Sequence, residues 1–571
     1  MLPSRFIILS LLLLHAIKDN PENKITFISP VKIPLSLSAN FGELRIDHFH
    51  SGLDIKTQGV TGKEVVAAAS GYIYRISVSP GGFGRALYIK HPSGYSTVYG
   101  HLEKFNPEID KYVNAQQYEK KSFLVTLYPP RERFQVRQGE IIAWSGNSGS
   151  SGGPHLHYEI RKSGDEIPVN PLFFDFGIAD NIKPVIEKLI VYPLNRNTLI
   201  NNQNKKEWIN VTGSNGKFNL SSDTEINISG EAGFGIKSFD QLDESNNKCA
   251  VYSIELLIDS NSVFKYVMDA FSFNESRYIN SHIDYEIYQK EKMYIERTFV
   301  LPNDKLSVYK NLVNRGICNF NDNRTHLAEI IVTDMNDNKS KLAFRIKART
   351  MKPAEVLVQP EGKLMPFSRR NSFETENIKV NIPNGALYDT IGFTYNKSAG
   401  SRGMLSEIHS IHNNYTPLHK PYTMSIKPDS VPPGKKSKML LVKIDDDKKK
   451  NAINSYWTEG YISAEMQSFG NFYVGIDTAG PEISANGLVN GANLTGRNEI
   501  RIRITDDLSG INYYDPSIDG KWALFEYDQK NDVLIYKFDS DRITRGTKHN
   551  LSLKVADNKD NISYFNYTFT W

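Results

Sequence analysis

The sequence predicts a mainly β protein in which a small antiparallel-sheet domain is followed by about three β-sandwich domains. A chain of 571 residues is longer than one hydrophobic core usually organises, so several domains are expected. Residues 25–178 contain short strand-like runs separated by turns rich in glycine, proline and serine. After residue 180 the chain consists of long β-rich stretches with Asn, Asp and Gly turns, a pattern typical of sandwiches.

The N-terminus has the layout of a secretory signal peptide. Arg5 precedes an apolar run over residues 6–14, which is too short to span a bilayer. We expect residues 1–19 to be a signal peptide, with an uncleaved N-terminal anchor as the alternative, because no A-x-A cleavage triplet follows. The mature chain is then expected to be exported to the periplasm or cell envelope without a membrane span. The small net charge of +4 argues against a nucleic-acid partner.

Residues 25–178 are expected to form the antiparallel sheet, with histidines on one face at the floor of a groove. The predicted strands are residues 71–77, 86–91, 96–99, 140–144 and 157–161. Residues 107–121 interrupt this pattern and could form a short charged helix with proline at its first position. This insertion either walls one end of the groove or is a neutral surface elaboration.

Three histidine-bearing stretches carry the chemistry. In the segment GPHLHYE, His155 and His157 share one face of a strand because side chains alternate with a period of two. Upstream, His50 and Asp54 are separated by three residues. Two imidazoles and one carboxylate from His50, Asp54 and His157 would make a three-ligand zinc site with a fourth position open to water. A third stretch, YSTVYGHL, ends a strand-like run on His101.

The order of these motifs resembles that of the lysostaphin-like zinc metallopeptidases, the M23 peptidase family. The resemblance covers roughly residues 35–175 and includes FGELR at residues 41–45. It implies that His50, Asp54 and His157 bind Zn²⁺, and that His101 and His155 handle the water and the developing oxyanion. His48 is expected to be a neighbour of the site, because the H-x-x-x-D register selects His50 as the ligand.

The resemblance also implies a function: a secreted zinc metalloendopeptidase that cleaves peptide cross-links in the stem peptides of bacterial peptidoglycan. Two alternatives stay open. Some family relatives have lost ligands and regulate other wall hydrolases, and an envelope adhesion or assembly protein could use the sandwiches instead. All five site positions are filled, which favours the enzyme. The β-sandwich tail is a candidate surface for an envelope protein partner.

The tail is expected to form sandwiches over residues 180–350, 351–476 and 477–571, the last resembling bacterial immunoglobulin-like domains. Two segments repeat with the same offsets: His326, Asp334, Asp337, Asn338 and His549, Asp557, Asp560, Asn561. Residues 225–236 and 499–511 parallel each other as well, each read as an alternating strand followed by a glycine-containing turn. The repeated Asp and Asn residues are expected to be turn formers, although their oxygens could also bind calcium.

Two smaller features complete the expectations. Cys249 and Cys318 either form one disulfide or are two buried thiols. His409, His412 and His419 are expected to be solvated loop residues, because no cysteine or carboxylate ligand lies near them in the sequence.

Overall fold

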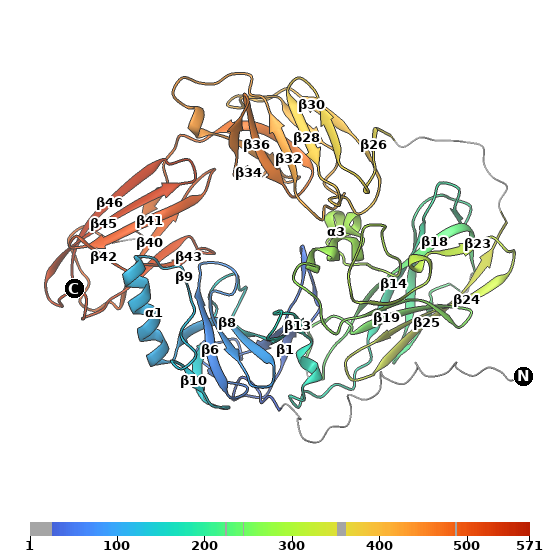
Figure 1. Ribbon diagram of the computed structural model, residues 1–571, viewed down its shortest axis with the longest axis horizontal. Coiled ribbons are helices and arrows are strands. Elements are labelled where there is room, and N and C mark those ends of the chain that lie inside the picture. The colour runs from blue at the N-terminus through green and yellow to red at the C-terminus, as the bar shows by residue number, and fades with distance from the viewer. Residues whose placement is uncertain (1–25, 223–224, 244, 351–360, 486–487) are drawn as a thin grey trace, which may run out of the picture.

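The computed structural model describes residues 26–222, 225–243, 245–350, 361–485 and 488–571. The expected signal peptide at residues 1–19 lies outside these ranges. The described chain forms four modules, here called first (26–178), second (180–348), third (363–476) and fourth (482–571) (Figure 1). The predicted mainly β fold is confirmed, while the predicted domain boundaries and the number of sandwiches stay predictions. None of the helices in the described ranges is long and apolar enough to cross a membrane.

The first module is built on an eleven-stranded sheet whose pairings are all antiparallel. Its main path runs in the order β1 (Leu37–Ala39), β4 (Leu53–Lys56), β12 (His155–Lys162), β8 (Tyr95–Phe105), β7 (Arg85–Lys90), β6 (Gly71–Val78) and β10 (Gln135–Val136). The predicted strands are all present, and β11 (Ile141–Ser145) pairs with β8 beside this path.

The alternation along β12 fixes which side chains face the site. Leu156, Tyr158 and Ile160 are fully buried in the core of the first module, and the intervening histidines occupy the opposite face. Burying each such apolar side chain contributes about 1.5–3 kcal/mol. A slip of one residue would move all three out of the core, so their burial fixes the register of β12.

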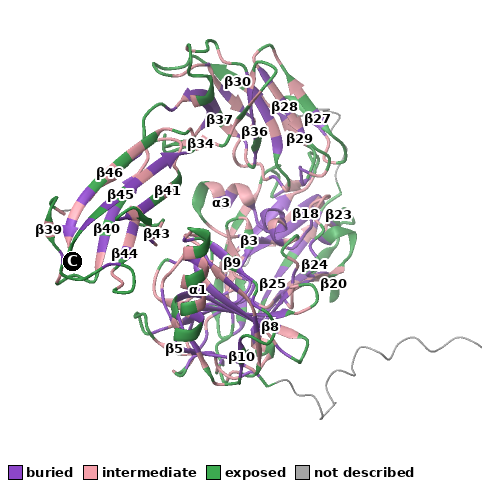
Figure 2. Cartoon of the chain, turned by 60° about the vertical axis from the view of Figure 1, so that its left-hand side comes forward, coloured by how far each residue is buried: buried purple, intermediate pink, exposed green. Residues whose placement is uncertain are grey.

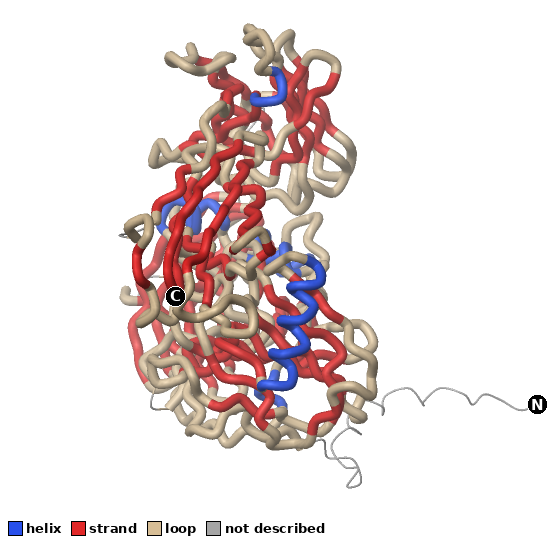
Figure 3. Tube along the Cα trace, turned by 90° about the vertical axis from the view of Figure 1, so that its left-hand side faces the viewer, coloured by secondary structure: helices blue, strands red, loops and turns tan. Residues whose placement is uncertain are grey.

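The predicted helix is present as α1 (Pro107–Lys120). Asn106 caps it by accepting a hydrogen bond from the Ile109 backbone N–H (3.0 Å), and Lys121 ends it in the left-handed conformation. Ile109 and Val113 are buried against the sheet, so α1 is fixed to the first module by one apolar face. Figure 3 shows this helix lying beside the strands of the fourth module.

The second module is a single twelve-stranded sheet. Its main path comprises β15 (Leu199–Ile200), β18 (Ile226–Phe239), β14 (Val185–Pro193), β16 (Glu207–Ser214), β17 (Lys217–Leu220), β25 (Lys339–Ala348), β24 (Thr325–Thr333), β19 (Ser253–Ile258), β20 (Asn261–Val267) and β22 (Tyr309–Leu312). The short helix α3 (Tyr285–Glu291) lies towards the third module in Figure 1.

The third and fourth modules each pack two sheets around one core, and buried residues follow their strands in Figure 2. In the third module, one sheet has the strand order β27 (Asn371–Glu374), β28 (Ile378–Ile382), β32 (Tyr422–Ile426), β36 (Tyr461–Met466) and β35 (Tyr456–Thr458). The other sheet has the order β30 (Tyr395–Ser398), β31 (Ile408–Ile411), β37 (Gly470–Ile476), β33 (Met439–Ile444) and β34 (Lys450–Ile453). In the fourth module, one sheet has the strand order β38 (Glu482–Ser484), β40 (Glu499–Thr505), β44 (Val533–Lys537) and β43 (Glu526–Asp528). The other sheet has the order β39 (Ala492–Asn493), β46 (Ile562–Thr570), β45 (Lys548–Asp557), β41 (Ile511–Ile518) and β42 (Lys521–Trp522).

Two predictions for the tail are corrected and one pair of alternatives is decided. No turn interrupts residues 226–239, because β18 is one continuous strand whose glycines serve close packing: a Cβ on Gly233 would lie 2.4 Å from the Phe299 ring. His409 is not a solvated loop residue, because it lies in β31 and is 1% exposed, whereas His412 and His419 are half-buried loop residues that each stack on an aromatic ring. Cys249 and Cys318 are both free and buried, which decides for the two buried thiols.

The modules close into a ring, since the fourth returns to the first (Figure 1). Arg85 in the first module forms an ion pair with Glu526 in the fourth (2.7 Å). The rings of Tyr118 on α1 and Trp522 on β42 meet edge to face at 5.2 Å. Residues more than 400 positions apart in the chain are therefore neighbours in the structure.

Candidate metal and catalytic site

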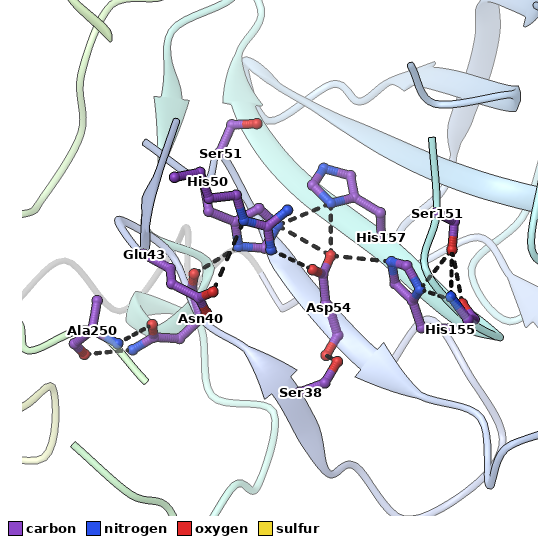
Figure 4. A network of polar contacts seen from close by, with 12 residues as sticks. Ser38, Asn40, Glu43, His50, Ser51, Asp54, Ser151, His155, His157 and Ala250 are labelled. Carbon is purple, nitrogen blue, oxygen red and sulfur yellow. Dashed lines mark hydrogen bonds and ion pairs between the residues drawn. The ribbon is translucent and has the colours of Figure 1, made fainter. Parts of the chain in front are cut away.

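The three histidine-bearing stretches meet because β12 lies between β4 and β8. The register places His157 opposite Asp54 on one side and Gly100 on the other. Asp54 Oδ1 lies 2.9 Å from His157 Nδ1 and 3.1 Å from His50 Nε2, and the two imidazole nitrogens are 3.1 Å apart (Figure 4). All three side chains are buried. They form a group that could hold a metal ion.

The hydrogen bonds on the far side of each ring show that the group suits a cation. His50 Nδ1 donates to the Asn40 carbonyl oxygen (2.7 Å), so the lone pair of His50 is on Nε2 and faces Asp54. His157 Nε2 donates to Glu159 Oε1 (2.9 Å), which leaves Nδ1 facing the group. Two nitrogen donors and one carboxylate oxygen are the ligand types that zinc takes in sites with an open fourth position.

Electrostatics at the group are dominated by burial and by the close approach of unlike charges. Burial lowers the pKa of His50, with partial compensation from Asp54. Burial also acts to lower the pKa of His157, but the hydrogen bonds that its ring donates to the carboxylates of Asp54 and Glu159 outweigh burial and raise that pKa to about 9. Burial acts to raise the pKa of Asp54, yet the histidines hold it below its ordinary value. A cation bound here would therefore displace a proton from His157.

His101 and His155 lie together beside this group. Their rings are 4.7 Å apart, and His155 Nε2 is 3.5 Å from Asp54 Oδ1. His155 Nδ1 donates to the Gly153 carbonyl (2.9 Å) and His101 Nδ1 to the Ser148 carbonyl (2.8 Å). Each ring therefore keeps Nε2 as its basic nitrogen. Burial, together with the neighbouring histidines, lowers the pKa of His101 to about 3, so this ring is neutral at neutral pH.

Residues 146–154, here called the Gly/Ser loop, connect β11 to β12 and supply both of these carbonyls. Close backbone contact holds this loop in place. A Cβ on Gly149 would lie 2.3 Å from the Gly84 nitrogen, and Gly149 has a φ of +69°, so this position requires glycine. Phe83, on the facing loop, stacks on the His157 ring at 4.7 Å and accepts a hydrogen bond from the His101 backbone N–H at its carbonyl (2.8 Å).

Sequence reasoning gave no role to two ion pairs around the ligands, one buried and one partly exposed. Glu159, which accepts from His157, is fully buried and is paired with Arg161. Arg45 donates to Asp54 Oδ2 (2.7 Å) from the hairpin of β2 (Leu44–Arg45) and β3 (His48–Phe49). The period of β12 could have revealed Glu159, because it lies two residues after His157 on the same face. His48 is exposed and contacts the Ile46 carbonyl, outside the group.

The second module braces the segment that carries His50. Asn40, whose carbonyl holds His50, exchanges two hydrogen bonds of 2.8 Å with the backbone of Ala250 in the second module (Figure 4). Phe41 and Phe49 are buried in the core of the second module. The candidate metal group of His50, Asp54 and His157 therefore lies in the first module but is supported by contacts with the second. No sequence motif indicates this support.

The family model that matches this region decides what kind of domain it is. The model described as peptidase family M23 matches residues 48–118 and 128–171, which contain His50, Asp54, His101, His155 and His157. The chain contains an M23 peptidase domain. A second model, for a Zu5-like domain, matches residues 362–477.

Curated relatives match the peptidase domain. An "uncharacterized metalloprotease" of Haemophilus influenzae is 37% identical over 123 residues, 22% of this chain and 20% of the relative. A "DD-carboxypeptidase/endopeptidase Mpg" of Neisseria meningitidis is 34% identical over 22% of each chain. The "murein hydrolase activator NlpD" of Escherichia coli is 30% identical over 22% of this chain and 25% of its own. The match thus spans a fifth to a quarter of the length of these relatives.

Solved structures match the same domain. The catalytic domain of the M23 protein EnpA from Enterococcus faecalis is 26% identical, covering 24% of this chain and 89% of that one, with a TM-score of 0.19. A zinc-containing peptidase from Vibrio cholerae is 26% identical, covering 26% and 40%, with a TM-score of 0.20.

Proposed function

We propose that the peptidase domain is a zinc metalloendopeptidase that hydrolyses peptide cross-links of bacterial peptidoglycan, and that the chain is exported to the cell envelope. The observation that carries the proposal is the convergence of His50 Nε2, Asp54 Oδ1 and His157 Nδ1 within 3.1 Å of one another, beside two histidines with basic nitrogens. The relatives named DD-carboxypeptidase/endopeptidase support a peptide bond in the cell wall as the target.

The chain's own residues divide the chemistry as follows. His50, Asp54 and His157 would hold the zinc ion, which when bound supplies Lewis acidity to the scissile carbonyl. His155 or His101 accepts a proton from the attacking water at Nε2 and passes it to the leaving amine nitrogen. The other imidazole donates a hydrogen bond to the tetrahedral oxyanion when it is protonated at Nε2 as well as at Nδ1. The carbonyls of Gly153 and Ser148 hold both rings in the orientation that this transfer needs.

The proposal predicts that zinc binding and turnover separate between two sets of variants. In the full chain, His50→Ala loses zinc and activity together, because one of only three protein ligands is gone. His155→Ala keeps one zinc per chain but loses about 10²–10⁴-fold in turnover, the usual contribution of a general acid or base. Muropeptide release from purified peptidoglycan, read by mass spectrometry, measures turnover, and elemental analysis measures zinc.

The matched control is His48→Ala, which removes an exposed histidine two residues from a ligand. It should change neither quantity. Activity of metal-free His50→Ala protein would contradict the metal assignment. A wild-type chain that holds zinc but releases no muropeptide would contradict the endopeptidase assignment for the chain alone.

One observation favours a second candidate function, an envelope regulator whose groove is covered by its own fourth module. Lys530 donates hydrogen bonds to the carbonyls of Asn147 and Ser151 in the Gly/Ser loop, the latter at 3.2 Å. Ser151 in turn contacts His155 Nδ1 through its hydroxyl (3.2 Å). The fourth module therefore touches the loop that supports both proposed catalytic histidines.

A further inference from the structure

Three buried aspartates meet where the peptidase domain joins the second module. Asp180 lies in the connecting segment, Asp240 directly follows β18, and Asp334 is in the turn between β24 and β25. Their exposed fractions are 7%, 3% and 2%. One carboxylate oxygen of each lies within 4.8 Å of those of the other two. Three acidic side chains are thus concentrated in one buried place, and without a bound cation burial, together with the neighbouring carboxylates, raises the pKa of Asp240 to about 8.

Asp240 provides the observation that points to a ligand. Its Oδ1 is buried and has no hydrogen-bond partner among the described residues. None of the ion pairs found in the described ranges involves Asp180, Asp240 or Asp334. A buried carboxylate without a partner is costly, and a bound cation is one of the few ways to compensate it.

The turn around Asp334 holds that carboxylate and the backbone of Asp180 in place. The backbone N–H groups of Asn336 and Asn338 donate to Asp334 Oδ1 at 2.8 and 2.9 Å. Asn338 Nδ2 also donates to the Asp180 carbonyl at 3.1 Å, which fixes the connecting segment against the turn. A cavity of about 280 Å³, lined in part by Asp180, Asp240 and Asn336, leaves room for water ligands.

We infer that Asp180, Asp240 and Asp334 bind a calcium ion that fixes the segment leaving the peptidase domain against the end of β18 and the turn between β24 and β25. The donors are carboxylate oxygens only, the set that hard cations prefer, and the group formed by the described residues includes no imidazole or thiol to select zinc. Calcium takes six to eight oxygens with flexible geometry, so water from the cavity would complete its coordination. The inference does not depend on the proposed peptidase activity.

The fourth module contains the same arrangement with one informative difference. Asp477, Asp506 and Asp557 occupy the corresponding positions, and Asn561 donates to the Asp477 carbonyl at 3.2 Å. However, Lys559 replaces the residue that corresponds to Asn336, and its charge interacts with those of Asp477 and Asp557. Because a lysine can supply the counter-charge there, we restrict the inference to the first group.

The experiment uses the full chain, stripped of metals and then saturated with zinc, so that the histidine site cannot contribute. Calcium chloride is titrated in by calorimetry and in thermal unfolding. We expect one calcium ion per chain beyond the zinc, and a melting temperature that rises with calcium concentration because calcium binds only the folded state. Absence of calcium binding at millimolar concentration would overturn the inference.

Two variants locate the site. Asp240→Asn removes the charge of the unpartnered carboxylate without breaking a hydrogen bond of Oδ1, and should weaken calcium binding at least tenfold. Asn336→Lys copies the fourth module by supplying an ammonium group, and should remove the calcium response while the chain stays folded without calcium. The matched control Asp506→Asn, in the fourth module, should keep the full response. Calcium binding that Asp506→Asn removes and Asp240→Asn retains would also overturn the assignment.

Discussion

Each histidine of the site uses one ring nitrogen to fix the role of the other. His50 and His157 are held by an oxygen acceptor behind them, the Asn40 carbonyl and the Glu159 carboxylate. His101 and His155 are held by carbonyls of the Gly/Ser loop. Orientation by such outer contacts sets which nitrogen is available to a metal or to a proton, so the outer contacts are as necessary as the rings.

Glu159 offers a test of this support at the level of one residue. The Glu159→Gln change keeps the shape of the side chain but removes the buried counter-charge of Arg161 and leaves only the half-exposed Glu166, which should lower the free energy of unfolding by about 3 kcal/mol at pH 7. The matched control is Glu166→Gln, which removes a half-exposed partner of Arg161 and should cost less than about 1 kcal/mol. Urea unfolding of metal-free protein measures both.

The pH dependence of this difference has a definite sign. Burial acts to raise the pKa of Glu159, but Arg161 and His157 outweigh it and lower the folded-state pKa to about 2. Because the folded pKa lies below the unfolded value of about 4.3, the carboxylate stabilises the fold fully above that pH. The difference between wild type and Glu159→Gln should shrink as pH falls from about 4 towards 2. A constant difference over that range would contradict the ion-pair explanation.

At this scale the sequence predicted much of what the structure brings together. The period of β12 placed His155 and His157 on one face because strand geometry is regular, and the resemblance to the M23 family implied that His50, Asp54 and His101 lie beside them. Arg45 and Asn40 had no such signal, since their partners lie across a hairpin and in another module. Whether the five residues bind zinc and catalyse stays a prediction.

Among the elements, the hairpin of β2 and β3 connects the metal group to the second module. Phe49 on β3 is buried with the core of the second module, and the Phe49 backbone N–H donates to Ser276 Oγ (2.9 Å). The predicted strands of the first module and the helix α1 were found because alternation, proline at N1 and turn residues are local signals. The continuous strand β18 was missed, because its glycines resemble turn residues and only their tertiary contacts show otherwise.

The brace predicts that Asn40 affects metal affinity without touching the metal. Asn40→Ala removes both hydrogen bonds to the Ala250 backbone and loosens the carbonyl that orients His50. We expect zinc affinity to fall about tenfold, the lower end of what loss of an orienting partner costs. Competition with a zinc-binding dye measures this affinity.

Asn303→Ala is the matched control for the brace. Asn303 makes a similar pair of side-chain hydrogen bonds, to the carbonyls of Gly385 and Leu387, but between the second and third modules. It should leave zinc affinity unchanged. Equal loss of affinity in both variants would mean that general destabilisation, rather than orientation of His50, is responsible.

For the whole molecule, the ring of modules determines how a large substrate meets the site. The sequence indicated several modules in series but gave no sign that the fourth would return to the first, because the contacts join side chains far apart in the chain and leave no local pattern. Arg85 with Glu526 and Tyr118 with Trp522 are two of these contacts, and Lys530 makes another with the Gly/Ser loop. The fourth module thereby lies beside the supports of His101 and His155.

The proposal that the fourth module restricts access to the site predicts a gain of activity when the contact of Lys530 with the Gly/Ser loop is removed. Lys530→Ala should raise the rate on polymeric peptidoglycan about threefold to tenfold, because the variant lacks the hydrogen bonds that favour the closed arrangement. A tenfold larger open fraction corresponds to a free energy of opening that is lower by about 1.4 kcal/mol. The rate on a short cross-linked muropeptide should change less. Lys521→Ala, an exposed lysine of the same module, is the control and should change neither rate. Equal loss of activity on both substrates would instead show that Lys530 supports the loop.

The closed ring also means that the contact between the first and fourth modules is intramolecular. The second and third modules act as a tether that holds the fourth module at a high effective concentration beside the peptidase domain. The interface itself combines the Arg85–Glu526 ion pair with half-buried apolar side chains of the fourth module, Tyr514, Leu524 and Tyr527, which pack against the core of the first module. Any outside partner that needs the same surface must displace this built-in competitor, so its apparent affinity is reduced by the fraction of molecules that are closed.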